Sequence, residues 1–486
     1  MEKKTVVLYP GVGVGHLAPM LELARAFLLH AGDQQVDVAI VVFEPPVYAN
    51  GFAATVARAK ASNTSVVLHV LPPPASDGGE SGDDAEPEDP LAWMLRFLRA
   101  TNAPLRDFLR ALSTASRRVQ AIVLDMFCAD ALDVADELGL PAYFFFPSGA
   151  AGLACFLGLP AMRARVGTSF AALGESAVLS FPGVPPLRVA DLAQGLADDG
   201  EACKGIIGVA ARMPDARGIL INSFESLEPR AMRALRDGLC LPERPTPPVY
   251  CVGPLAHQLL RVAGAARDEG AQGRTVLAGA PHAAGLLRRA AGLARRRHGP
   301  RLPPLAGRAA GPQRRVPLLR EPGHVPQEAA GKDRRGCGEV RAEVDVLRHR
   351  AAGAFVTHCG WNSTLEGVVA GLPLLCWPLY AEQKMNKVRI VEEMKLVVEM
   401  RRRDDDDVET AEAVEAKVRW VMKDSDGARA LRERAAAARD RAAEALSEGG
   451  PSRILATISP MCGPYICTSE KFTLRRGRIL AQHFVT

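Results

Sequence analysis

The chain has 486 residues, 48% of them hydrophobic, which is enough to form the cores of two domains. It contains no apolar run of the roughly 18 to 20 residues that a membrane-spanning helix needs, so we expect no membrane insertion. The net charge of +5 comes from one segment, between Arg274 and Arg335, which contains fourteen basic and three acidic residues. No aromatic residues alternate with these charges, and this argues against nucleic-acid binding.

We expect no targeting signal at the start of the chain. MEKK leads directly into the strand-like TVVLY, without a secretory apolar region or a small-residue cleavage site, so we expect a cytoplasmic protein. The ten cysteines are scattered and show no metal-ligand spacing. They are expected to be reduced thiols, and no metal site is predicted.

Strand and helix patterns alternate through the first half of the chain. Residues 5–9 form a strand-like run, followed by GVGVGH and a helical pattern with Pro19 near its start, which is typical of a βα unit in a doubly wound sheet. The glycines at 11, 13 and 15 do not fit the G-x-G-x-x-G dinucleotide fingerprint. The other elements expected in this half are strands at 36–42, 121–124, 142–146, 218–222 and 248–253 and helices at 91–112, 129–138 and 226–239. The alternation predicts a mostly parallel sheet with helices on both faces, in a first domain of residues 1–253.

Two titratable residues each follow a predicted strand, where the sites of such sheets collect. They are His16 and Asp125. One interpretation is purely local, with a histidine in a turn and an acid at a helix start. The other is a base and its orienter, because a carboxylate that accepts from one ring nitrogen leaves the other free to take a proton. The pattern by itself leaves both interpretations open.

Aromatic residues in this half are candidates for lining a ligand pocket. Phe127, Tyr143 and Phe156 could line a site for a flat ligand, and Ser148 lies just past a predicted strand. Ordinary core packing is the alternative for each ring.

Residues 355–383, FVTHCGWNSTLEGVVAGLPLLCWPLYAEQ, carry the clearest functional pattern. An apolar strand at 353–357 turns through Gly360 into a helical pattern, and the spacing of Ser363 and Glu366 predicts a capping box that starts this helix. A strand that passes through a glycine turn into a helix N-terminus is a ready phosphate site. His358, Asn362 and Ser363 can donate hydrogen bonds, and Glu366 can accept them. A second strand is expected at 374–377 and leads toward Glu382 and Gln383. The alternative is that Ser363 and Glu366 only cap the helix and that His358 is a half-buried structural histidine.

The order HCGWNSxxEG followed by PLYAEQ resembles the signature box of the plant family 1 UDP-dependent glycosyltransferases of the flavonoid and phenolic glucosyltransferase type. The resemblance implies an α/β fold of the GT-B class, with two Rossmann-like doubly wound domains facing a cleft. In that family the histidine, the Asn-Ser pair and the backbone of the turn hold the diphosphate, the glutamate holds the ribose, and the acidic-Gln pair holds the sugar. The UDP-sugar-binding residues implied here are His358, Gly360, Trp361, Asn362, Ser363, Glu366, Glu382 and Gln383.

The first domain carries the rest of the resemblance. HLAPM and VLDMFC match the places of the family's catalytic dyad, which implies that His16 and Asp125 are catalytic, and acceptor contacts are expected from Phe127, Ser148 and Tyr380. The implied reaction is inverting transfer of a sugar, with glucose favoured by Gln383, to a hydroxyl of a small phenolic plant metabolite such as a flavonoid. UDP-glucose is then a co-substrate, no cofactor or metal is needed, and we expect a monomer.

Residues 271–343 depart from the resemblance. They are rich in Arg, Ala, Gly and Pro and show no strand or helix pattern where the family's second domain begins. Codons compatible with residues 276–289 and 336–343, read one nucleotide later, can spell family-like text, which indicates a shifted reading frame. Val340 and Glu343 stand where the family has a tryptophan that stacks on uracil and a glutamine. We therefore expect a linker and anomalous segment at 254–343, an incomplete second domain at 344–452 and an atypical tail at 453–486. Because the second domain would be damaged, the alternative function is that of a catalytically inactive glycosyltransferase.

Overall fold

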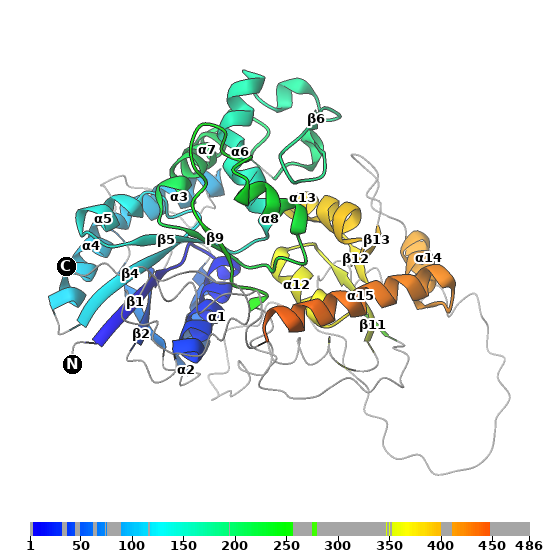
Figure 1. Cartoon of the computed structure of the whole chain (residues 1–486), viewed down its shortest axis with the longest axis horizontal. Helices are drawn as coiled ribbons and strands as arrows, with labels where there is room; N and C mark the ends of the chain where they lie inside the picture. The colour runs from blue at the N-terminus through cyan, green and yellow to red at the C-terminus, as the bar shows by residue number, and fades with distance from the viewer. Residues whose placement is uncertain are drawn as a thin grey trace, which may run out of the picture.

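The computed structural model describes residues 3–31, 36–43, 49–61, 66–72, 74, 89–114, 117–193, 195–255, 275–278, 347, 349, 352–399 and 411–447. These residues form two α/β lobes (Figure 1). The first lobe comprises the described residues up to 255, and the second lobe comprises those from 275 onward.

The first lobe is built on a seven-stranded sheet in which every pair of neighbours is parallel, in the order β3-β2-β1-β4-β5-β8-β9. Its strands are β1 (Lys3–Tyr9), β2 (Val36–Phe43), β3 (Val66–Leu71), β4 (Arg117–Asp125), β5 (Ala142–Phe146), β8 (Ile219–Ile221) and β9 (Val249–Cys251). The short strands β6 (Val178–Leu179) and β7 (Leu187–Arg188) form a separate antiparallel pair. The order reverses beside β1, so the carboxyl ends of β1 and β4 meet where such sheets place their sites.

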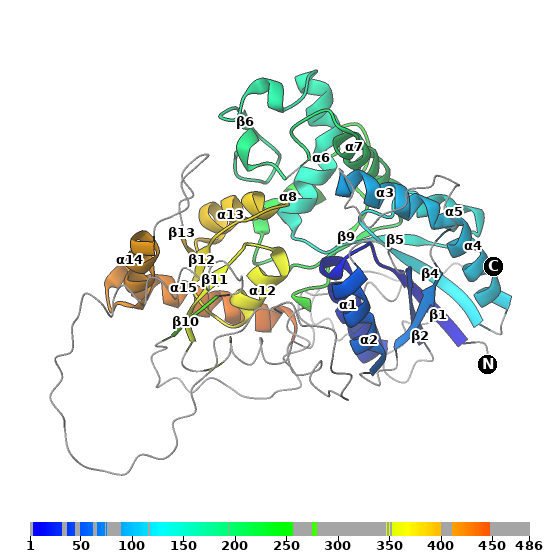
Figure 2. The same cartoon turned by 180° about the vertical axis from the view of Figure 1, so that it is seen from behind.

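Helices cover both faces of this sheet (Figures 1 and 2). Alternate residues of the strands point to opposite sides, so one face packs against α1 and α2 and the other against α3 to α8. The helices are α1 (Val14–Ala31), α2 (Ala49–Ala61), α3 (Pro90–Ala100), α4 (Asn102–Thr114), α5 (Ala131–Glu137), α6 (Ala150–Val166), α7 (Glu201–Arg212) and α8 (Pro229–Arg236), with short helices η1 (Ala171–Leu173), η2 (Val189–Asp191) and η3 (Met213–Asp215). The doubly wound architecture predicted for this half of the chain is confirmed.

The second lobe has a smaller parallel sheet in the order β10-β11-β12-β13. Its elements are β10 (Thr275–Ala278), β11 (Ala352–Thr357), α12 (Trp361–Val369), β12 (Leu374–Cys376), α13 (Gln383–Arg389), η5 (Ile390–Met394), β13 (Val397–Glu399), α14 (Ala411–Met422) and α15 (Asp426–Ala445). Ala354 and Val356 of β11 pack toward α14, whereas Phe355 between them packs on the other face. Strand β11 ends at Thr357, directly before the turn at Gly360.

The first helix and the helix expected at 91–112 differ from the sequence prediction. Helix α1 begins at Val14, so that Pro19 lies inside it and His16 occupies its first turn. Pro19 lies beyond the first turn, so the helix lacks the hydrogen bond that an N–H at this position would donate to the Gly15 carbonyl. The single helix expected at 91–112 is two helices, because the chain turns at Thr101, whose hydroxyl donates to the Leu98 carbonyl at 2.6 Å.

The prediction of no strand pattern after residue 271 is wrong at one point. Residues Thr275–Ala278 form β10, which pairs in parallel with β11. Thr and Val are β-branched and favour a strand, and the pairing with β11 supplies the tertiary contact that a run of four residues needs. The rest of the anomalous segment and the tail at 453–486 lie outside the described residues.

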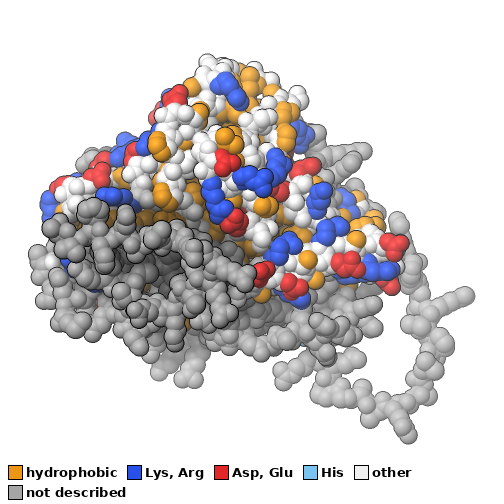
Figure 3. Space-filling model, in the orientation of Figure 1, with side chains coloured by type: hydrophobic (Ala, Val, Ile, Leu, Met, Phe, Trp, Pro, Cys, Tyr) orange, Lys and Arg blue, Asp and Glu red, His pale blue; other side chains and the backbone are white. Residues whose placement is uncertain are grey.

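Other sequence expectations concern membranes and thiols. Among the described helices, none combines the length and the apolar character that a bilayer crossing would require. The seven cysteines in the described ranges are free and buried. On the face shown in Figure 3, basic and acidic side chains of the described part are interspersed.

The two lobes pack directly on each other. The indole N–H of Trp361 donates to the Asn222 carbonyl at 2.7 Å, and the Asn222 amide donates to Asn362 Oδ1 at 3.2 Å. Lys384 donates to the Ala190 carbonyl at 3.1 Å. Phe224 and Leu227 of the first lobe share one buried cluster with Trp361. The end of β8 is therefore joined to the start of α12.

Candidate functional site

His16 and Asp125 meet at the carboxyl ends of β1 and β4. His16 Nδ1–H donates to Asp125 Oδ2 at 2.8 Å, and the other carboxylate oxygen accepts from the Phe127 N–H at 3.1 Å. Asp125 is fully buried, whereas 21% of the His16 side chain is exposed. Because Nδ1 carries the proton toward the carboxylate, Nε2 is the ring nitrogen left to accept a proton.

The electrostatics of this pair favour proton uptake. Burial alone would lower the pKa of His16, but the charge and the hydrogen bond of Asp125, with a smaller contribution from Glu382, raise that pKa above its usual value of 6.5. The imidazole is thus a stronger base than a free histidine.

Gly11 is what allows the pair to approach so closely. A Cβ at this position would lie 2.6 Å from Asp125 Oδ1 and 3.6 Å from the His16 ring. An added Cβ would displace the Asp125 carboxylate oxygen, whereas its distance from the His16 ring is that of an ordinary contact. The first glycine of GVGVGH is therefore required by space, not by backbone conformation.

The turn of the signature box begins the helix earlier than predicted. Cys359 has a φ of 67°, and the N-cap of α12 is Gly360, so the capping box expected from Ser363 and Glu366 is wrong. The first helical hydrogen bond runs from the Thr364 N–H to the Gly360 carbonyl at 2.9 Å. The N–H groups of residues 361–363 consequently lack an intrahelical acceptor and form the positive end of the helix.

A buried amide fixes the shape of this turn. Asn386 is fully buried, and its amide donates to the Cys359 carbonyl at 2.9 Å. Arg389, only 1% exposed, donates in turn to Asn386 Oδ1 at 2.5 Å. Neither residue was predicted, because an Asn and an Arg in a helix give no signal in sequence until the helix is placed against the turn.

His358 lies beside Gly360 at the start of the turn. A Cβ on Gly360 would lie 2.4 Å from His358 Nε2, so the glycine makes room for the ring. Burial lowers the pKa of half-buried His358, and Glu382 only partly opposes this. His358 is therefore neutral near pH 7 and can offer one N–H to a phosphate oxygen, while the helix end supplies the positive potential.

Glu382 connects the two lobes electrostatically. Its carboxylate acts on His16 of the first lobe and on His358 of the second. It also accepts from the Asn386 amide at 3.3 Å. The two histidines, 342 positions apart in the sequence, thus lie within electrostatic reach of one carboxylate.

The remaining residues of the box have different surroundings. Trp361 is 3% exposed and lies at the lobe interface, with its ring 5.8 Å from the Arg389 guanidinium carbon. Gln383 is 3% exposed, and its amide oxygen accepts from the N–H groups of Leu379 and Tyr380 at 2.7 and 3.0 Å. Asn362, Ser363 and Glu366 are half-buried on the first two turns of α12. Trp361 can serve the site only through its backbone, whereas the last three can present side chains.

The predicted acceptor residues do not form one group. The Phe127 ring lies 5.1 Å from the His16 ring, and Ser148 lies at the lobe interface near Arg389. The side chain of Tyr380 is 64% exposed on the second lobe. Tyr143 and Phe156 are 5% and 7% exposed and belong to the two cores of the first lobe, so core packing is the correct interpretation of both rings.

Within the described ranges, no three His, Cys, Asp or Glu side chains are grouped as metal ligands would be. Val340 and Glu343, which stand where the resemblance expects a base-stacking tryptophan and a glutamine, lie outside the described residues. The polar groups that converge on the site are those of the two histidines, Asp125, Glu382 and the start of α12.

Comparisons with known proteins identify the family that the chain resembles. Residues 341–427 match the family described as UDP-glucoronosyl and UDP-glucosyl transferase. The chain is 34% identical over 482 residues to UDP-glycosyltransferase 88B1 of Stevia rebaudiana, covering 93% of this chain and 97% of that protein. It is 32% identical over 493 residues to a phloretin 2'-O-glucosyltransferase of Pyrus communis, covering 92% and 97%. A UDP-glucosyltransferase from Polygonum tinctorium that glucosylates indoxyl, solved with 3,4-dichloroaniline, superposes with a TM-score of 0.72 at 27% identity, covering 95% of this chain and 99% of that one.

Proposed function

The chain belongs to the plant UDP-glycosyltransferase family, and we propose that it catalyses inverting transfer of glucose from UDP-glucose to a hydroxyl of a small phenolic compound. Its two parallel α/β lobes have the GT-B architecture. Members of the family take the sugar from a UDP-sugar, which is a co-substrate. The observation that carries the proposal is the His16–Asp125 hydrogen bond on one lobe, within electrostatic reach of the Glu382 carboxylate on the other.

The proposed mechanism assigns one role to each lobe. In the first, the acceptor hydroxyl gives its proton to His16 Nε2 as its oxygen attacks the anomeric carbon, and Asp125 stabilises the imidazolium that forms. In the second, the N–H groups at the start of α12, with His358, Asn362 and Ser363, hold the diphosphate. The bond from the anomeric carbon to UDP breaks on the opposite face, its electron pair leaves with the phosphate oxygen, and the configuration at that carbon inverts.

The other contacts are assigned by the resemblance to the family. Glu366 would accept from the ribose hydroxyls, and Glu382 with Gln383 would hold the sugar. Phe127, beside His16, would contact a flat acceptor, with Ser148 and Tyr380 as outer contacts. The relatives named as phloretin 2'-O-glucosyltransferase and anthocyanidin 5,3-O-glucosyltransferase, the latter 31% identical, support a phenolic acceptor of the flavonoid type.

Asp125→Asn is expected to change the pH dependence of transfer in a defined direction. Activity should fall as pH drops through the raised pKa of His16, because a protonated imidazole cannot act as a base. Without the Asp125 charge this pKa falls, so the acid limb of kcat/KM should move to lower pH while the plateau decreases by about 10²-fold or more. A pH–rate profile of both proteins tests this, and an acid limb that stays in place would contradict the assigned pairing.

Gly360→Ala is expected to weaken UDP binding by about tenfold to hundredfold, the equivalent of one hydrogen bond to a charged group. The backbone at φ −61° and ψ 142° accepts alanine, so the effect comes from the new Cβ, which must displace the His358 ring. Calorimetric titration with UDP measures it. Gly208→Ala, where a Cβ meets nothing within 4 Å, is the matched control and should leave UDP affinity unchanged.

A catalytically inactive protein is the alternative, favoured by the sequence of residues 271–343. The same titration separates the two possibilities. Saturable binding of UDP, together with transfer that depends on His16, supports the enzyme. No binding at about millimolar UDP, which corresponds to a binding free energy weaker than about 4 kcal/mol, would support the inactive alternative.

A further inference from the structure

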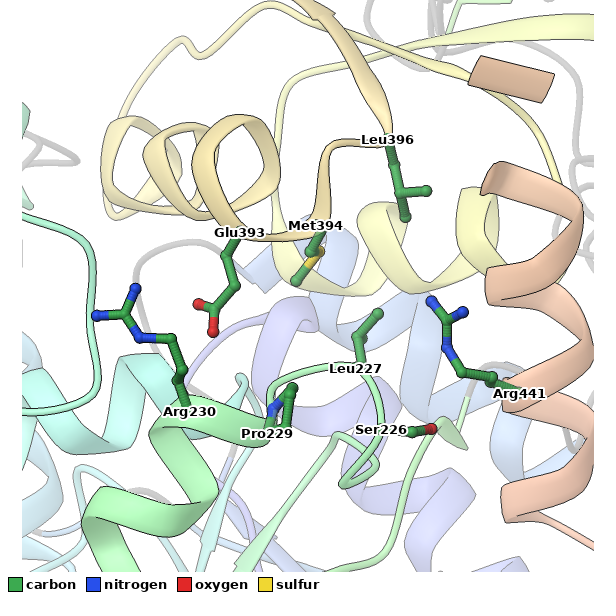
Figure 4. Close-up of a pocket in the computed structure, with 8 residues that line it drawn as sticks. All are labelled: Ser226, Leu227, Pro229, Arg230, Glu393, Met394, Leu396 and Arg441. Carbon is green, nitrogen blue, oxygen red and sulfur yellow. The ribbon is translucent and has the colours of Figure 1, made fainter. Parts of the chain in front are cut away.

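A separate cavity of about 300 Å³ lies where the two lobes meet, and none of the site residues assigned above lines it. Figure 4 shows Leu227, Pro229 and Arg230 of the first lobe facing Glu393 and Met394 of η5, with Leu396 and Arg441 completing the wall. Cavities at domain interfaces are common places for small ligands, and this volume stands at the lower end of such sites. It fits a molecule of about one ring.

The floor of this cavity is apolar. Leu227 and Leu396 are 4% and 2% exposed and belong to the cluster that includes Trp361. Met394 packs against the same cluster. Leucine, methionine and proline side chains around a small volume favour a ligand with an apolar body.

Two polar atoms in the cavity wall lack a hydrogen-bond partner. Glu393 Oε1 and Arg441 Nε are both buried, and neither is paired within the described part of the chain. Burial is the main reason that the pKa of Glu393 is raised, with Glu228 adding to it and Arg230 and Arg389 opposing it. Buried donors and acceptors cost free energy until a partner supplies the hydrogen bond. The wall therefore requires an acceptor for Arg441 and a donor for Glu393.

The charges of the wall indicate the charge of the ligand. The lining contains two basic residues, Arg230 and Arg441, and one acidic residue, Glu393, so it favours an anion. A carboxylate can accept from arginine, and a hydroxyl at the other end of a flat ring can donate to Glu393. We propose that this cavity binds a small hydroxylated aromatic carboxylate. Phosphates and aliphatic dicarboxylates lack the apolar ring that the floor favours.

Such a ligand would contact both lobes at once. Ligands that bind between two lobes favour the arrangement in which both surfaces are engaged, so the cavity is a candidate regulatory site. The proposal does not rest on the proposed transfer reaction, since binding here can be measured without a sugar donor.

Calorimetric titration of the full chain with 4-hydroxybenzoate and with benzoate tests the proposal. Both acids are expected to bind in this cavity, 4-hydroxybenzoate about tenfold or more tightly than benzoate, because only the former donates to Glu393. Arg441→Met should weaken both acids by about tenfold to hundredfold. Glu393→Met should abolish the preference between the two acids.

Arg429→Met on the same helix is the matched control. Arg429 is exposed and does not line the cavity, so both affinities should stay unchanged. Should Arg441→Met fail to fold, as judged by circular dichroism, the preference lost in Glu393→Met still decides the matter. The proposal is overturned if neither acid binds, if Glu393→Met keeps the preference, or if binding is lost in Phe127→Ala, which would place the acid in the acceptor site beside His16.

Discussion

Replacing His16 with alanine should lower kcat by about 10²- to 10⁴-fold, the usual contribution of a positioned general base. Asp125 raises the pKa of this histidine and orients its ring through a hydrogen bond with an Nδ1–Oδ2 distance of 2.8 Å, so the alanine variant loses a base that is both strengthened and positioned. UDP affinity should be unchanged, because the proposed diphosphate site is built by the second lobe. Steady-state kinetics with a phenolic acceptor, together with UDP titration of the same protein, measures both effects.

The alanine variant also leaves Asp125 buried with one hydrogen-bond partner fewer, which costs about 1 to 3 kcal/mol of stability. His16→Asn is therefore a useful companion, since its amide can still donate to the carboxylate. Both variants should bind UDP normally and transfer poorly. Turnover within about tenfold of the wild type in either variant would refute His16 as the base.

Replacing Trp361 with alanine should destabilise the protein by about 3 to 5 kcal/mol, the usual cost of removing a buried tryptophan from a core. The side chain is 3% exposed, donates to the Asn222 carbonyl and lies under Arg389. It also fills the space over Gly149, where a Cβ would approach its ring to 2.4 Å. Urea denaturation followed by tryptophan fluorescence and circular dichroism gives the free energy of unfolding.

Two companion variants separate the contributions of Trp361. Trp361→Phe keeps most of the ring but loses the N–H, so the Asn222 carbonyl is left short of a donor at a cost of about 1 to 3 kcal/mol. Trp420→Ala removes the same side chain from a position that is 41% exposed. The decrease in unfolding free energy should therefore be clearly smaller than for Trp361→Ala. Equal losses of unfolding free energy on alanine substitution at positions 361 and 420 would show that Trp361 does not hold the lobes together.

The boundaries of several elements were beyond sequence reasoning for identifiable reasons. The capping-box spacing of Ser363 and Glu366 is real, but the left-handed conformation of Cys359, held by Asn386, starts the helix three residues earlier, with Gly360 as its N-cap. Thr101 interrupts a helical pattern that runs on through both α3 and α4, and the Tyr9 hydroxyl that bonds it comes from a strand 92 residues away. Both differences depend on contacts between residues far apart in the chain.

The sequence by itself determined the α/β class, the parallel first sheet and the order of candidate donors and acceptors around Gly360, because period, glycine turns and residue type are local properties. The tertiary structure alone decided that His16 meets Asp125, that Glu382 acts on both histidines and that Trp361 joins the lobes. It also decided that Tyr143 and Phe156 are core residues. The physical reason is that pKa shifts and burial depend on which side chains are brought together, and that follows from packing, not from spacing along the chain.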